Sequence, residues 1–187
     1  MTAKIIKALG VSAALGIAAM PLTTFAVDPA TGDADVSVTI NPSISMTLDT
    51  SSVSTAIDLS AADITTMKIK ASVSTNARGG YTLELNDQDT DTALRHETLN
   101  SPYKIDTSAA APTAGTSSWA VKGGEVTNWA AMPASNGTAL TLKSAAAPTN
   151  GIISNEQTEV TYGVASGNDL ASGTYSDTVV YTATAVE

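Results

Sequence analysis

The chain has no cysteine and only one histidine, and its few charged residues are mostly acidic. Without cysteine it has no disulfide bonds, no thiolate metal sites and no lipid attached to a cysteine. The histidine, His96, lies in the charged stretch Arg95–Glu97, where we expect a solvent-exposed turn and no catalytic triad. No glycine-rich phosphate loop and no His/Glu zinc pattern occurs. The sequence therefore predicts a protein that is not an enzyme and is stabilised by packing alone.

What is present begins with an export signal. Lys4 and Lys7 precede an apolar run from Ala8 to Leu22, and the segment closes on Thr24-Phe25-Ala26. The run is shorter than the roughly 20 residues of a membrane span, and small residues stand three and one positions before the end. The pattern predicts a secretory signal peptide at residues 1–26, a secreted protein at the extracellular cell surface, and no transmembrane segment in the mature chain.

The mature chain is strongly acidic. Removing Lys4 and Lys7 leaves seven basic and 18 acidic residues, a formal net charge of −11. This charge repels nucleic acid and anionic lipid headgroups, so no nucleic-acid partner is expected. We expect a flexible leader at residues 27–34 and a single domain at residues 35–187.

Apolar residues alternate with polar ones along the first part of that domain. Val36, Val38 and Ile40 are separated by Ser and Thr, and the same phase continues after Pro42 through residues 44–48. A period of two is typical of a half-buried strand, and proline is tolerated at an edge. The pattern predicts an edge strand over residues 35–48, bent at Pro42.

Two further pairs of alternating segments predict hairpins. The first joins residues 67–73 to residues 81–85 through the glycine-containing turn at residues 76–80. The second joins residues 160–164 to residues 175–183 through a polar turn.

The middle of the chain contains short apolar pieces between long segments rich in Ala, Pro, Thr and Ser. Residues 108–117 and 144–151 are expected to be loops. Trp119 and Trp129 are expected to be large anchors of the core. Together the patterns predict an all-β fold, an antiparallel immunoglobulin-like β-sandwich.

The acidic stretch Asp87-Gln88-Asp89-Thr90-Asp91 has the spacing of a calcium loop, because alternate carboxylates in a tight turn can converge on a hard cation. The full motif is absent, since Thr92 stands where glycine is required and Glu97 comes one position early. We expect a solvated acidic turn and no cofactor, with calcium held by Asp87, Asp89 and Asp91 as the alternative.

Two segments resemble major subunits of alpha-class, colonisation-factor-type chaperone–usher fimbriae. They are the start, Asp35-Val-Ser-Val-Thr-Ile-Asn-Pro-Ser-Ile-Ser-Met-Thr-Leu-Asp49, and the ending, Ser172-Gly-Thr-Tyr-Ser-Asp-Thr-Val-Val-Tyr-Thr-Ala-Thr184. The resemblance implies an immunoglobulin-like pilin whose amino-terminal strand fills a groove in a neighbouring copy. It makes residues 35–48 the donor strand, with Val36, Val38 and Ile40 as its apolar side chains. It also implies copies of the chain, a periplasmic chaperone and an outer-membrane usher as partners.

A second resemblance overlaps the first. The segment Val73-Ser-Thr-Asn-Ala-Arg-Gly-Gly-Tyr-Thr-Leu-Glu-Leu85 is similar to the Arg-Gly-x-Gly-Trp-x-Leu hairpin of WxL-type surface domains of Gram-positive bacteria, with Tyr81 in place of tryptophan. This resemblance implies a monomeric, wall-associated or adhesive binding module. Our leading hypothesis is the polymer-forming surface subunit, because the alternating apolar segment follows so closely behind the leader.

Overall fold

The structure is a computed structural model that describes residues 31–58, 64–99, 102–149 and 151–187. Within these ranges it contains eleven strands and no helix, which confirms the all-β prediction. The strands are β1 (Ile44–Leu48), β2 (Ile64–Thr75), β3 (Gly80–Asp87), β4 (Leu94–His96), β5 (Lys104–Thr107), β6 (Ser118–Gly123), β7 (Val126–Ala130), β8 (Leu140–Ala145), β9 (Ile153–Ala165), β10 (Tyr175–Ser176) and β11 (Val179–Val186).

The chain divides into two units, residues 1–39 and residues 40–187, and all eleven strands belong to the second. The predicted signal peptide, residues 1–26, lies outside the described residues, as does the first half of the predicted leader, residues 27–30.

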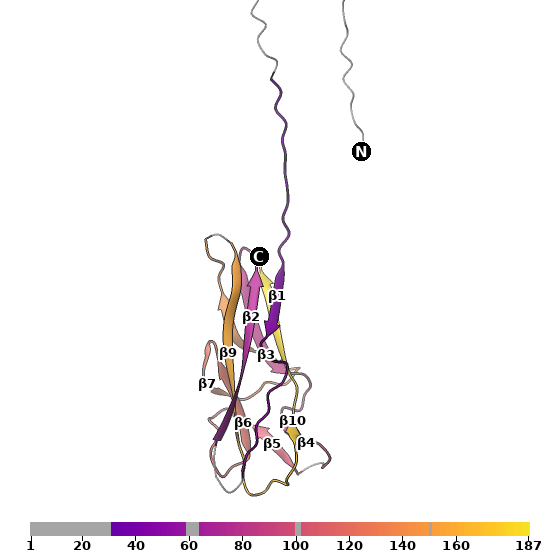
Figure 1. The fold of residues 1–187 in the computed structure, drawn as a ribbon, viewed down its shortest axis with the longest axis vertical. Helices are drawn as coiled ribbons and strands as arrows, with labels where there is room; N and C mark the ends of the chain where they lie inside the picture. Colours follow the sequence, from indigo (N-terminus) through magenta and orange to yellow (C-terminus); the bar gives the residue numbers. More distant parts are fainter. Residues whose placement is uncertain (1–30, 59–63, 100–101, 150) are drawn as a thin grey trace, which may run out of the picture. The chain divides into compact units, whose positions relative to one another are not determined.

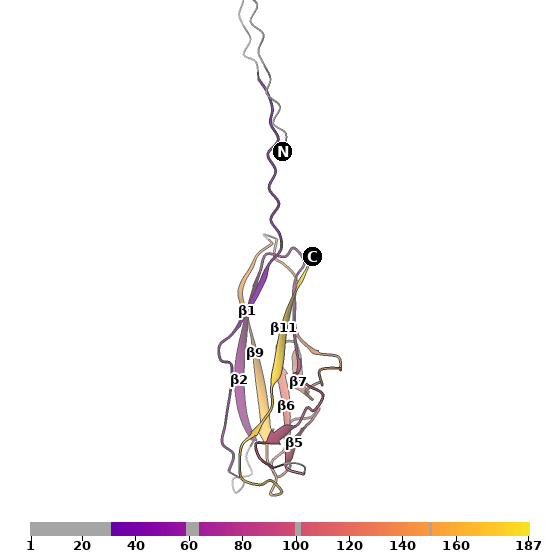
Figure 2. The same cartoon turned by 90° about the vertical axis from the view of Figure 1, so that its right-hand side faces the viewer.

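The strands form two sheets (Figures 1 and 2). The larger sheet has the order β1-β2-β9-β6-β5-β4-β10, with β7 paired to β6, and the smaller sheet has the order β11-β3-β8. All pairings are antiparallel except that of β5 with β6, which is parallel. That pair departs from the expected antiparallel pattern, and the long loop at residues 108–117 returns the chain to the start of β6.

Side chains from both sheets meet in one apolar core. Alternation decides which side chains face it, because successive residues of a strand point to opposite faces. Along β2 the predicted residues Ile69, Ala71 and Val73 are buried while Lys68 and Lys70 are exposed. The buried core residues, with side chains of three or more carbons, are Ile69, Val73, Tyr81, Leu83, Leu85, Ile105, Trp119, Val121, Met132, Leu142, Ile153, Val160, Tyr162, Val164 and Tyr181.

Both predicted hairpins are wrong. β2 pairs with β1 and β9 in the larger sheet, whereas β3 pairs with β11 and β8 in the smaller one. Likewise β9 and β11 belong to different sheets. In each case the connection crosses from one sheet to the other, so the two apolar faces oppose each other across the core instead of lying side by side. Alternation specifies the buried face of a strand but does not identify its partner.

Candidate functional site

The predicted donor residues are exposed and belong to no strand. Val36, Val38 and Ile40 are 90%, 83% and 80% exposed, more than any other large apolar side chain among the described residues. The predicted edge strand over residues 35–48 is therefore only half correct. Residues 44–48 form β1 on the edge of the larger sheet, whereas residues 35–40 belong to no strand.

A free sheet edge lies elsewhere in the domain. β11 pairs only with β3, so within the described chain its second edge carries no strand. β1 is the outermost strand of the other sheet, and its backbone comes close to that of β11. An unpaired edge offers a row of backbone donors and acceptors to an incoming strand.

Apolar side chains along this edge are incompletely covered. Ile44, Met46 and Leu48 of β1 are half-buried, as are Val179 and Ala183 of β11. In the middle of the sheets the inward side chains are fully covered: Ile69 is 5% exposed and Leu83 is 0% exposed. We call the uncovered pair of strands the β1–β11 edge. An added strand with apolar side chains at alternate positions would cover it.

The start of β1 and the end of β11 lie at the same end of the domain. The backbone N–H of Ser43 donates to Oδ1 of Asn76 at 2.6 Å. In the same turn the N–H of Gly79 donates to the carbonyl of Val186 at 2.9 Å. The chain therefore enters the domain next to the last residues of β11, the strand with one free edge.

The acidic stretch builds turns from its own carboxylates. Oδ1 of Asp87 accepts the N–H of Asp89 at 2.9 Å, and Oδ1 of Asp89 accepts the N–H of Asp91 at 2.6 Å. Oδ1 of Asp91 in turn accepts the N–H of Ala93 at 3.4 Å. Each aspartate thus caps the backbone two residues on, which is the Asx turn. The spacing that suggested calcium is explained by three successive turns.

The three aspartates also differ in their surroundings. Asp91 is exposed and accepts a hydrogen bond from Nε of Arg95 at 2.6 Å, and this bond holds the pKa of Asp91 below its usual range. Asp87 is fully buried at the end of the inward face of β3. No three His, Cys, Asp or Glu side chains of the described residues are placed so that they could hold a metal ion.

Asp177 is the acidic residue that the sequence did not single out. It stands two residues before β11, and its Oδ2 is buried without a hydrogen-bond partner among the described residues, as is Oδ2 of Asp87. The alternating face Tyr81, Leu83, Leu85 continues to Asp87, so the inward position of Asp87 could have been read from the sequence. The pairing of β3 with β11 brings Asp177 close to Asp87, and this pairing could not have been read from the sequence.

The expectation of a solvated turn at His96 is wrong. His96 is 9% exposed and ends β4, where its ring meets the edge of Tyr175 at a centroid distance of 5.0 Å. Nδ1 accepts the backbone N–H groups of Thr98 and Leu99 at 3.1 and 3.0 Å. Nε2 lies 3.2 Å from the carbonyl oxygen of Ser172, so it carries the proton and donates it. The His96 ring therefore links the segment that follows β4 to the segment that precedes β10.

The two tryptophans differ in burial. Trp119 is 2% exposed and is a core anchor as predicted, with Nε1 donating to the carbonyl of Thr92 at 2.9 Å. Trp129 is only half-buried. Its ring packs on Gly163, and Nζ of Lys122 lies 4.5 Å from the ring centroid. Trp129 therefore covers a glycine of β9 from outside and is not part of the buried core.

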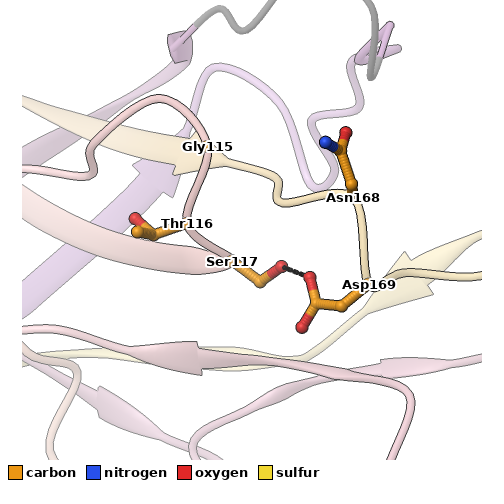
Figure 3. A pocket seen from close by; sticks show the side chains of 5 residues that line it. All are labelled: Gly115, Thr116, Ser117, Asn168 and Asp169. Atoms are coloured by element: carbon orange, nitrogen blue, oxygen red, sulfur yellow. Dashed lines mark hydrogen bonds between the residues drawn. The ribbon is translucent and has the colours of Figure 1, made fainter.

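An open polar depression is lined by residues of two loops, Gly115, Thr116, Ser117, Asn168 and Asp169 (Figure 3). Oγ of Ser117 donates to Oδ1 of Asp169 at 2.8 Å and accepts the N–H of Gly167 at 3.0 Å. His96 is not among the lining residues, so no imidazole is placed to activate the serine. The hydroxyl instead ties the loop before β6 to the loop after β9.

No protein-family model matches this chain, and no curated protein matches its sequence. The described residues include no helix that could span a membrane.

Proposed function

We propose that this chain is a structural subunit of a bacterial cell-surface fimbria or similar polymer. Residues 35–40 of one copy add as a strand to the β1–β11 edge of the next copy. One observation carries the proposal: three large apolar side chains at alternate positions are exposed on a segment without a partner strand, while the same domain has a sheet edge without a partner strand. The exposed segment needs a partner strand, and the free sheet edge offers one.

Such a pairing would bury apolar side chains and would be specific for one register of the added strand. Burying a Val or Ile side chain contributes about 1.5–3 kcal/mol. Val36, Val38 and Ile40 would lie against the half-buried Ile44, Met46 and Leu48, and the backbone of the added strand would satisfy the free edge of β11. Ser37 and Thr39 would then face solvent. A long, unpaired apolar edge on a monomer is an aggregation hazard, which a dedicated donor strand removes.

The wider context of the proposal comes from the family resemblance. An immunoglobulin-like pilin is exported, is held by a periplasmic chaperone and is passed to an outer-membrane usher. We propose the same partners and an extracellular location for this chain, which depends on the predicted signal peptide at residues 1–26. The proposed role is structural and adhesive, without an enzymatic activity.

The test compares two substitutions in the same segment. Val38→Asp buries a carboxylate in the proposed contact, whereas Ser37→Asp adds the same charge to the face that points away. Size-exclusion chromatography and electron microscopy of the mature protein should show polymers for wild type and Ser37→Asp and should show none for Val38→Asp. A deletion of residues 28–40 should be unstable alone and stabilised by a peptide of residues 35–48 added in trans.

A monomeric wall-associated or adhesive module, which the second resemblance implies, predicts other results. The wild-type protein would be a monomer at every concentration, with or without an assembly partner, and Val38→Asp would only lower its stability. An equal effect of Val38→Asp and Ser37→Asp on assembly would also contradict strand addition.

A further inference from the structure

The buried carboxyl group of Asp87 and the half-buried carboxyl group of Asp177 lie near each other where the chain enters β11. The strand register pairs Val179 directly with Asp87, and the N–H of Gln88 donates to the carbonyl of Thr178 at 3.0 Å. Continuing this register places Asp177 opposite Asp89 and diagonal to Asp87. Residues 177 and 179 share a face, because side chains alternate, so Asp177 points toward the same side as Asp87.

One oxygen of each carboxyl group is satisfied and the other is not. Oδ1 of Asp87 accepts the N–H of Asp89, and Oδ1 of Asp177 accepts the N–H of Thr178 at 2.7 Å. Oδ2 of Asp87 and Oδ2 of Asp177 are buried and have no donor among the described residues. Burying a carboxylate oxygen without a donor is costly, and burying two beside each other is more so.

No cation of the described chain neutralises this pair. The ion pairs of the described residues do not include Asp87 or Asp177. Their basic partners are Lys68, Lys70, Arg95, Lys104 and Lys143. The only other charged group that acts on the pKa of Asp177 among the described residues is Asp89, and its negative charge raises that pKa further. The segment at residues 133–137, which bonds to the backbone of Asp87 and Asp89, has no titratable side chain. A proton shared between the two neighbouring carboxyl groups would give both Oδ2 atoms a partner without a cation.

We propose that Asp87 and Asp177 share one proton at neutral pH and that this proton fastens the segment entering β11 to the end of β3. One carboxylic acid donates its proton to the other carboxylate, so the pair carries one negative charge. When the proton leaves, two negative charges lie close together at a partly buried place, and the start of β11 is pushed away from β3.

The electrostatics of the site support the shared proton. Burial and the neighbouring carboxyl group of Asp87, with a smaller contribution from the charge of Asp89, raise the pKa of Asp177 to about 7, compared with roughly 3.9 in an unfolded chain. A group that holds its proton more tightly in the folded state stabilises the fold below its unfolded pKa. This contribution therefore falls as the pH rises from about 4 and is lost above about 7. His96 of β4 also packs against this connection, at Ser172 and Tyr175.

The pair lies within one domain, so the proposal is independent of polymer formation. Only its consequence rests on the proposed function: if β11 is the edge that receives a strand, a higher pH would weaken assembly by loosening that edge. The test below follows the proton itself in the full mature protein, whatever its assembly state, so its failure is separate from a failure of the proposed function.

The experiment is infrared spectroscopy of the carbonyl band of carboxylic acids. At pH 6 ordinary Asp and Glu side chains are ionised, so a remaining carboxylic acid band reports a protonated buried carboxyl group. We expect this band in wild type at pH 6, its loss by pH 9, and its absence in Asp177→Asn. The control Asp33→Asn removes an exposed carboxylate and should keep the band.

Thermal unfolding gives a second readout. An Asn amide at position 177 can donate permanently to Asp87, so Asp177→Asn should melt at or above the wild-type temperature at pH 9. The two proteins should converge at pH 5, and Asp33→Asn should follow wild type. A missing band at pH 6, or a band that persists in Asp177→Asn, would overturn the proposal. So would a calcium-induced rise in melting temperature that Asp177→Asn abolishes, since the pair would then hold a cation.

Discussion

The hydroxyl groups of Tyr162 and Tyr181 lie 2.6 Å apart and join the two sheets across the core. Tyr162 belongs to β9 and Tyr181 to β11, and burial keeps both neutral. Burial raises the pKa of Tyr181 to about 12 and holds the pKa of Tyr162 above its usual range. The bond therefore anchors the strand that has a free edge to the sheet opposite.

A double-mutant cycle should reveal this bond. Tyr181→Phe leaves the hydroxyl of Tyr162 buried without its partner, which should cost about 1–3 kcal/mol of unfolding free energy. The double variant Tyr162→Phe/Tyr181→Phe removes both polar groups, so it should cost less than the sum of the single variants. Urea denaturation of the three variants measures the coupling. Additive costs would show that the two hydroxyls do not interact.

Gly173 should not tolerate a side chain. A β-carbon there would lie 2.1 Å from Nε2 of His96, which holds the carbonyl of Ser172. Gly173→Ala should therefore displace the ring and destabilise the domain by about 1–3 kcal/mol, the usual range for overpacking. Gly32→Ala is the control, because no atom lies within 4 Å of the position of its β-carbon. Equal melting temperatures for the two variants would contradict the packing described for His96.

Calcium should leave the melting temperature nearly unchanged, because the acidic stretch uses its carboxylates in turns. Asp89→Ala removes the acceptor for the N–H of Asp91 and should cost about 0.5–1.5 kcal/mol. Asp89→Asn keeps an acceptor oxygen and should cost less. A ligand at a hundredfold excess over its Kd stabilises the folded state by about 2.7 kcal/mol. A calcium-induced shift of that size, lost in Asp89→Ala, would show that the aspartates bind the ion.

The sequence predicted the buried faces of the strands well and their partners poorly. Alternation identified the inward residues of β2 and β3 because burial on one face requires it. It could not distinguish a hairpin from a crossing between sheets, since Ile69 and Leu83 follow the same pattern in either case. His96 looked exposed among charged neighbours, but the pairing of β4 with β10 brings Tyr175 against its ring. Asp177 went unnoticed because its partner Asp87 lies 90 residues earlier in the chain.

Export should remove residues 1–26. Thr24 and Ala26 provide the small residues of a cleavage site, so intact-mass measurement of protein from the cell surface should give a chain that begins at Val27. The matched variant Ala26→Pro should block processing and leave the precursor uncleaved. Retention of Met1 in surface protein would contradict the export prediction, and with it the proposed location.

Strand addition is tested most directly by a disulfide bond between copies. The chain has no cysteine, so a bond can form only where cysteines are introduced. Ser37→Cys marks the outward face of the donor segment. Val180→Cys, Thr182→Cys and Thr184→Cys mark the outward face of β11, where all three residues are exposed. Neighbouring strands bring opposite residues to about 4.5–5.5 Å between α-carbons, which a disulfide can span.

The measurement co-expresses the Ser37→Cys chain with one β11 variant at a time and identifies the linked peptides by mass spectrometry after mild oxidation. The control partner is Thr127→Cys, an exposed position on β7 in the other sheet. Strand addition predicts a disulfide from position 37 to at least one of the three β11 positions and none to position 127. If position 37 links to none of the β11 positions more than to position 127, residues 35–40 do not pair with β11.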